Sequence, residues 1–161
     1  VSTLLAELDG LTSKGMDEII ITIGATNVPW LIDSAILSRF QKRVYVPLPD
    51  AVARQVMLEI FLTRRGHQTE ISFEELVSRT KGYSGREIEQ LCQTAITYMT
   101  QRANPDLMDV VEQGQDAVRD YEIQVEPLSR ADFDLAFEQI QPASDPDTLR
   151  RYQEWSQKVE G

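Results

Sequence analysis

The spacing of apolar residues changes near residue 50, and the two parts of the chain predict different architectures. Residues 2–11 carry leucines at helical intervals, whereas 19–23 is an unbroken run of β-branched residues. Such a run, without polar alternation, predicts a strand covered on both faces, as in a parallel α/β sheet. Residues 43–46 predict a second short buried strand, and 33–39 predicts a short helix between the two. The first part therefore predicts the last strands of a parallel sheet.

Beyond residue 50 the pattern is helical. The prolines at 47 and 49 predict a stiff extended connector, because the residue before each proline is pushed away from helical backbone. Capping residues predict helices that begin at Asp50, Ser72, Ser84 and Ser129. A proline at 146 suits the first turn of a last helix. We therefore expect a fold of class α/β plus α, with an α/β part at 1–49 and a helical part at 50–161.

The helical part also predicts its own core. The helix from Asp50 is expected to run through Arg65, with Val52 and Val56 on its buried side. The long helix after Ser84 has an apolar stripe made of Ile88, Leu91, Cys92, Ala95, Ile96 and Met99. Residues 121–125 alternate between apolar and polar side chains, which predicts a short edge strand.

Composition narrows the classes of function. A net charge of −10 argues against a nucleic-acid surface, because phosphate binding needs a basic face. The single cysteine excludes an internal disulfide framework and a cysteine zinc cluster, and it favours a reducing, cytosolic setting. No apolar run approaches the roughly 18 residues that a membrane helix needs. The opening Val1 leads directly into a patterned helix without a signal peptide, so we expect the sequence to start inside a longer protein.

Five segments in a fixed order resemble a known family. They are Ile-Gly-Ala-Thr-Asn-Val-Pro-Trp (23–30), Leu-Ile-Asp-Ser-Ala-Ile-Leu-Ser-Arg-Phe (31–40), Val-Tyr-Val-Pro-Leu-Pro-Asp (44–50), Gly-Tyr-Ser-Gly-Arg-Glu-Ile (82–88) and Pro-Leu-Ser-Arg-Ala-Asp-Phe (127–133). Together they resemble the second half of an AAA ATPase core, followed by its helical lid. Trp30 and the tail 149–161 are similar to the group that contains katanin, spastin, fidgetin and the vacuolar-sorting ATPase. Only 104–126 is poorly matched.

The resemblance implies two catalytic residues. Asn27 corresponds to sensor 1, a neutral amide that would hold the attacking water and sense the γ-phosphate; without the neighbouring motifs it would be only a turn residue before a proline. Arg39 resembles an arginine finger, which acts on the nucleotide bound by its neighbour in a ring and therefore requires an oligomer. Relatives usually carry a second arginine, but Leu37 and Ser38 stand there. Lys42 or Arg43 are alternative cations, and an ordinary surface role is the other interpretation.

The resemblance also implies a nucleotide-binding turn in the lid. Gly82, Ser84 and Gly85 would contact adenine and ribose, since glycine allows close backbone approach and a helix start supplies N–H groups. Arg86 departs from the group, which usually has a small residue there. More distant relatives place a γ-phosphate-binding arginine at the start of this helix, so Arg86 is a candidate for that role. A solvated first-turn arginine is the alternative.

Two elements of a complete ATPase are absent from the sequence. It has no Gly-x-x-x-x-Gly-Lys-[Ser/Thr] motif, and no apolar strand is followed by Asp-Glu, since Asp17-Glu18 precedes its strand. We therefore expect ATP and Mg²⁺ to serve the intact protein, and we expect these 161 residues alone to bind neither, to hold no metal and to hydrolyse no ATP.

The implied parent is a cytoplasmic hexamer that remodels protein substrates and meets membranes only through them. A catalytically dead interaction module and a proteasomal or mitochondrial AAA branch are the alternatives.

Overall fold

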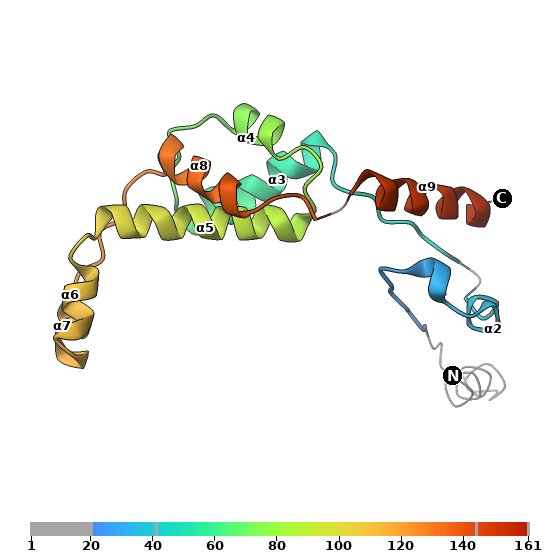
Figure 1. The fold of residues 1–161 in the computed structure, drawn as a ribbon, viewed down its shortest axis with the longest axis horizontal. Coiled ribbons are helices and arrows are strands. Elements are labelled where there is room, and N and C mark those ends of the chain that lie inside the picture. The colour runs from blue at the N-terminus through green and yellow to red at the C-terminus, as the bar shows by residue number, and fades with distance from the viewer. Residues whose placement is uncertain (1–20, 41, 144, 161) are drawn as a thin grey trace. The chain divides into compact units, whose positions relative to one another are not determined.

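The computed structural model describes residues 21–40, 42–143 and 145–160, which fall into two compact units (Figure 1). Unit 1 joins Val1–Val46 with Pro146–Gly161, and unit 2 is Pro47–Asp145. The predicted helix at 2–11 and the first two residues of the predicted strand at 19–23 lie outside the described residues. Among the helices that are described, none is long and apolar enough to cross a membrane.

Unit 2 is helical, as predicted. Its elements are α3 (Ala51–Phe61), η2 (Thr63–Arg65), α4 (Phe73–Arg79), α5 (Gly85–Ala103), α6 (Leu107–Glu112), α7 (Gln115–Asp120) and α8 (Arg130–Gln139). The predicted caps are confirmed: the side chains of Asp50, Ser72, Ser84 and Ser129 each accept a hydrogen bond from a backbone N–H in the first turn of their helix. The first helix ends at Phe61, and a 3₁₀ turn takes the chain to Arg65.

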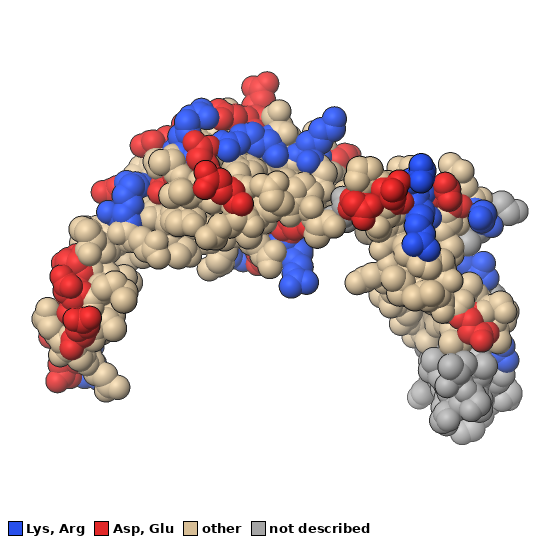
Figure 2. All heavy atoms as spheres, in the orientation of Figure 1, with Lys and Arg blue, Asp and Glu red and all other residues tan. Residues whose placement is uncertain are grey.

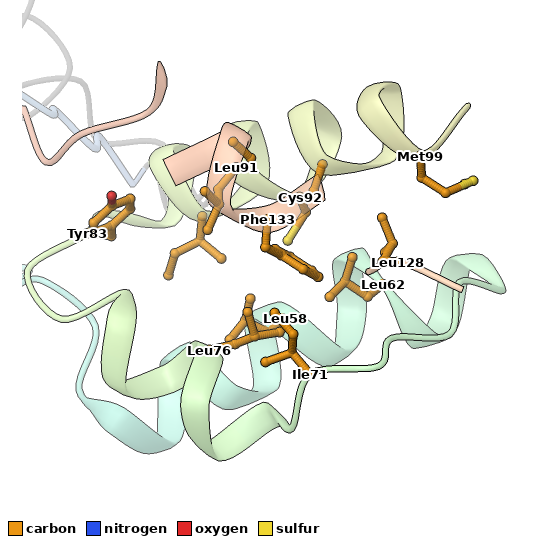
Figure 3. Packing of buried hydrophobic residues seen from close by; sticks show 13 residues of the cluster. Leu58, Leu62, Ile71, Leu76, Tyr83, Leu91, Cys92, Met99, Leu128 and Phe133 are labelled. Atoms are coloured by element: carbon orange, nitrogen blue, oxygen red, sulfur yellow. The ribbon is translucent and has the colours of Figure 1, made fainter. Parts of the chain in front are cut away.

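The core of unit 2 lies between α3, α4, α5 and α8 (Figure 3). The predicted stripe of α5 is confirmed, with Leu91 and Cys92 almost fully buried against Phe133 of α8. The prediction for α3 was wrong, because Val52 and Val56 are 72% and 44% exposed.

Arg54 explains the error, since its face of α3 packs inward. Its guanidinium donates to the carbonyl of Pro49 at 3.0 Å and to that of Val77 at 3.1 and 3.3 Å. A charged residue can occupy a buried face when its donors are satisfied in this way, and hydrophobic periodicity does not reveal it.

The helices α6 and α7 form an arm beyond the end of α5 (Figure 1). Figure 2 shows acidic side chains gathered along it. The edge strand predicted at 121–125 is wrong. The amide of Asn104 takes the place of a neighbouring strand: it donates to the carbonyl of Gln124 at 2.9 Å and accepts from its N–H at 2.8 Å. Among the described residues, the β pairing is a single bridge between Thr69 and Leu128.

Unit 1 holds η1 (Pro29–Leu31), α2 (Ser34–Leu37) and α9 (Pro146–Glu160). The short helix predicted at 33–39 is confirmed as α2, capped by Asp33. The two predicted strands are not formed in the described part of unit 1, where residues 21–26 and 42–46 are extended but unpaired. A strand needs a neighbour for its backbone hydrogen bonds. Their apolar side chains are correspondingly exposed, Ile23 by 87% and Val46 by 81%, so the parallel sheet is not confirmed.

Candidate functional site

Asn27 lies where the extended segment of unit 1 turns toward η1. Its side chain is exposed, while its backbone is held on both sides. The N–H of Val28 donates to Oγ1 of Thr26 at 3.1 Å. The hydroxyl of Tyr152, on α9, donates to the backbone carbonyl of Asn27. The structure therefore presents the Asn27 amide at the surface from a fixed stretch of main chain.

An aromatic cluster of Trp30, Tyr45 and Tyr152 attaches α9 to this segment. The ring of Tyr152 is 5.1 Å from that of Trp30 and 6.2 Å from that of Tyr45, between centroids. The guanidinium of Arg151 lies 4.2 Å from the centre of the Trp30 ring, a cation–π contact. A shallow cleft beside this cluster is lined by Trp30, Arg151, Glu154, Trp155 and Lys158.

Arg39 follows α2 and folds back over it. Its guanidinium donates to the carbonyl of Ala35 at 2.8 Å and to Oγ of Ser38 at 3.4 Å, and its side chain is exposed. The next residue, Phe40, lies against Gly24: a Cβ atom added at Gly24 would be 3.3 Å from the Phe40 ring. This contact brings the segments of Arg39 and Asn27 together. Arg43 is half-buried and donates to the carbonyl of Leu37 at 2.9 Å.

The lid residues Gly82, Ser84, Gly85 and Arg86 form one turn at the start of α5 in unit 2. Gly82 has φ +87°, a backbone conformation that residues with a side chain rarely adopt. Gly85 sits over Met57, whose Cε would be 3.5 Å from an added Cβ. Arg86 is exposed beside the helix start. The first N–H groups of a helix have no acceptor within it, so this turn can offer donors to an anion.

Glu87 fixes that turn from below. Its Oε2 accepts from the N–H of Ser84 at 2.6 Å, which completes the predicted capping box, and its Oε1 accepts from the N–H of Ala143 at 2.5 Å. Burial raises the pKa of Glu87, but these hydrogen bonds outweigh it and hold the pKa below its ordinary value. The neighbouring Tyr83 hydroxyl donates to the carbonyl of Ile140 at 2.6 Å. The turn and the segment 140–143 are thus joined twice.

The predicted site residues therefore form two groups, one in each unit: Asn27 with Arg39, and Gly82 through Arg86. Sequence reasoning missed Tyr152 as a partner of Asn27 and missed the bond from Ala143 to Glu87. The only signal for Tyr152 was a hydroxyl on the apolar face of the last helix, since buried tyrosine hydroxyls usually find a partner. Within the described ranges, no three His, Cys, Asp or Glu side chains lie close enough to hold a metal ion.

Comparison with known proteins identifies both parts of the chain. Residues 1–48 match the family model of the ATPase family associated with various cellular activities (AAA). Residues 70–113 match the AAA+ lid domain. The two family models follow one another along the chain in the order that the five motifs predicted.

The similar proteins are of the katanin type. The meiotic spindle formation protein mei-1 of Caenorhabditis elegans is 30% identical over 96% of this chain and 32% of its own length. The A-like 1 form of the katanin p60 ATPase-containing protein of Homo sapiens is 31% identical over 96% of this chain and 31% of its own length. The chain thus spans about a third of the length of these curated relatives.

Solved structures agree with this assignment. The FIGL-1 AAA domain in complex with ADP matches 98% of this chain and 51% of its own, with a TM-score of 0.74 and 28% identity. A structure that describes katanin self-assembly matches 84% of this chain and 46% of its own, with a TM-score of 0.67 and 31% identity. The sequence motifs, the two family models and these neighbours together show that the chain belongs to the AAA ATPases and is related to katanin and FIGL-1.

Proposed function

We propose that the intact protein is an ATP-hydrolysing, ring-forming ATPase that remodels a protein substrate, and that these 161 residues carry its nucleotide-sensing and inter-subunit elements. In this proposal, 1–49 is the remainder of the large α/β subdomain and 50–161 is the lid with its C-terminal helix. The observation that carries it is the exposed Asn27 amide on fixed main chain, within a segment that matches the AAA model. The FIGL-1 relative, solved with ADP, supports nucleotide use.

The chemistry assigned to Asn27 is to orient the attacking water. An amide offers both a donor and an acceptor without a charge, so it can hold a water against the γ-phosphate without repelling it. The turn from Gly82 through Arg86 would contact the base and ribose, and the exposed Arg86 would contact the γ-phosphate. Mg²⁺ bound with ATP would neutralise phosphate charge. We assign none of its ligands to the described residues, which hold no suitable cluster.

Arg39 would act on the nucleotide of a neighbouring protomer. Its exposed side chain, on a segment that packs through Phe40 onto Gly24, supports a role at a surface near Asn27. The solved relative that describes katanin self-assembly supports an oligomer, and a hexameric ring is our proposal for this protein. Because Leu37 and Ser38 replace a second arginine, we expect Arg39 to carry this function alone, with Arg43 engaged by the carbonyl of Leu37.

Several features support a protein substrate in the cytoplasm. The net charge of −10 disfavours nucleic acid as the ligand of this part of the protein. One relative is named for meiotic spindle formation. Membranes would be reached only through the substrate.

Complementation between two variants of the intact protein tests the proposal. Asn27→Ala and Arg39→Ala should each reduce ATP turnover at least about tenfold. Mixed rings should recover activity, because a protomer with Arg39→Ala keeps an intact site that can receive the arginine of an Asn27→Ala neighbour. Lys42→Ala serves as the exposed-cation control and should retain turnover.

Two results would contradict the proposal. Mixing without recovery would mean that Arg39 does not act between protomers. No ATP turnover by the intact wild-type protein would favour the catalytically dead module instead.

A further inference from the structure

We propose that Tyr152 is a positioning residue for Asn27, and that α9 thereby controls the geometry of the proposed sensor. The inference rests on the proposed function, because it matters only if Asn27 senses nucleotide. It concerns a single peptide group, the one that joins Asn27 to Val28.

Both polar atoms of this peptide group are bound by side chains. Its carbonyl, on Asn27, accepts from the Tyr152 hydroxyl, and its N–H, on Val28, donates to Oγ1 of Thr26. A peptide group is planar, so two bonds at its opposite edges fix the orientation of the whole plane. That plane sets ψ of Asn27 and therefore the direction of its Cα–Cβ bond. Only the side-chain torsions of Asn27 are left to respond to a ligand.

The Tyr152 hydroxyl is itself held in place. Its ring packs against Trp30 and Tyr45, at centroid distances of 5.1 and 6.2 Å, and Arg151 lies over the Trp30 ring at 4.2 Å. The ring is half-buried, and Pro29 next to the peptide is buried as well. The hydroxyl therefore acts as a fixed donor, in contrast with a long flexible side chain or a water molecule.

The expected effect of losing this bond follows from its role. The amide of Asn27 must place a water within hydrogen-bond reach of the phosphate, and small displacements of a positioned group lower the rate steeply. Substrate affinity should change little, because neither Tyr152 nor the peptide is assigned a contact with the nucleotide. A change confined to turnover therefore distinguishes positioning from binding.

The test uses the full-length protein with Tyr152→Phe, which keeps the ring and removes only the hydroxyl. We expect kcat for ATP to fall about three- to tenfold, as for loss of one hydrogen bond, with KM unchanged. Thr26→Val removes the acceptor at the other edge and should give a similar loss. Tyr98→Phe, a half-buried tyrosine of α5, is the matched control and should retain wild-type turnover.

The double variant separates positioning from a general structural effect. If both bonds fix one peptide plane, Tyr152→Phe with Thr26→Val should lose little more than either single variant, with unchanged oligomer size in sedimentation. Losses that multiply would overturn the inference, as would an unchanged kcat in Tyr152→Phe or a loss explained by ring disassembly. Asn27→Ala tests the proposed function separately: full turnover in that variant would remove the sensor role itself.

Discussion

Gly82 has a backbone conformation that few other residues can adopt, and its surroundings are open. Its φ is +87°, yet no atom of the described residues lies within 4 Å of an added Cβ. Gly66 shares both properties, with the same φ and the same open space among the described atoms. The useful difference between the two glycines is location, because Gly82 belongs to the proposed nucleotide-binding turn and Gly66 does not.

This pair gives a controlled prediction. Gly82→Ala and Gly66→Ala should each destabilise the lid by about 1 kcal/mol, from backbone strain alone. In the intact protein only Gly82→Ala should weaken nucleotide binding, measured with a fluorescent ADP analogue. Equal effects of both variants on binding would argue against a ligand at this turn.

Arg86 is the residue at which the lid departs from its group. If it contacts the γ-phosphate, Arg86→Ala in the intact protein should weaken ATP binding at least about tenfold and leave ADP binding almost unchanged, as expected for loss of a charge-assisted hydrogen bond. Isothermal titration with ADP and a non-hydrolysable ATP analogue measures both. Arg64→Ala, another exposed arginine of the lid, is the control. Equal losses for the two nucleotides would exclude the γ-phosphate role.

At the residue scale, the sequence predicts identities better than partners. Asn27 and Arg39 are recognisable because short motifs surround them. The partner of the Asn27 carbonyl, Tyr152, is 125 residues away, and Ala143 is 56 residues from Glu87. Nothing local marks either bond, since both depend on how distant segments pack.

Helix starts were the most predictable elements, because a cap and its first turn lie within four residues. The predicted strands were not formed, because strand pairing requires a neighbour that the local sequence does not specify. The alternation at 121–125 is satisfied instead by the side chain of Asn104. The periodicity of α3 was misread because Arg54 occupies a buried position through its bonds to carbonyls.

The start of α5 yields a pH-dependent prediction. The folded lid holds the pKa of Glu87 below its ordinary value, so its carboxylate stabilises the fold above its unfolded pKa and loses that contribution as the pH falls through its folded pKa. Glu87→Gln should therefore cost about 1–2 kcal/mol at neutral pH and clearly less near about pH 3.5. Urea unfolding of the 161-residue chain at both pH values measures the difference.

Glu89→Gln is the matched control on the same helix. Glu89 is exposed and pairs with Arg65 at 3.4 Å, so its loss should change the free energy of unfolding by less than about 0.5 kcal/mol. An equal cost of Glu87→Gln at both pH values would show that shape, and not charge, matters at this position.

At the scale of the molecule, the family was predictable although the sheet was not. No single motif identified it, but five in order with compatible spacing did, and two family models match the same regions. The exposed Ile23 and Val46 show why the sheet did not form: their predicted strands have no paired neighbour among the described residues. The charge distribution, acidic along the arm of α6 and α7, agrees with the prediction against nucleic acid (Figure 2).

The buried thiol of Cys92 makes the lid its own reporter. It is the only cysteine in the 161 residues and is 1% exposed, and burial raises its pKa to about 12. Only the thiolate reacts with thiol reagents, so at pH 7 about one molecule in 10⁵ would carry the reactive form even if the reagent could enter. Labelling therefore requires the lid to open.

We expect a disulfide reagent to modify the native chain slowly and the chain in guanidinium at once. A Gln90→Cys variant, exposed on the same helix, should react immediately at its new thiol and slowly at Cys92. Fast modification of Cys92 in the native chain would mean that α5 and α8 separate readily. Slow modification makes its rate a clock for opening of the lid core, one that can be read with and without nucleotide once the same lid is part of the intact protein.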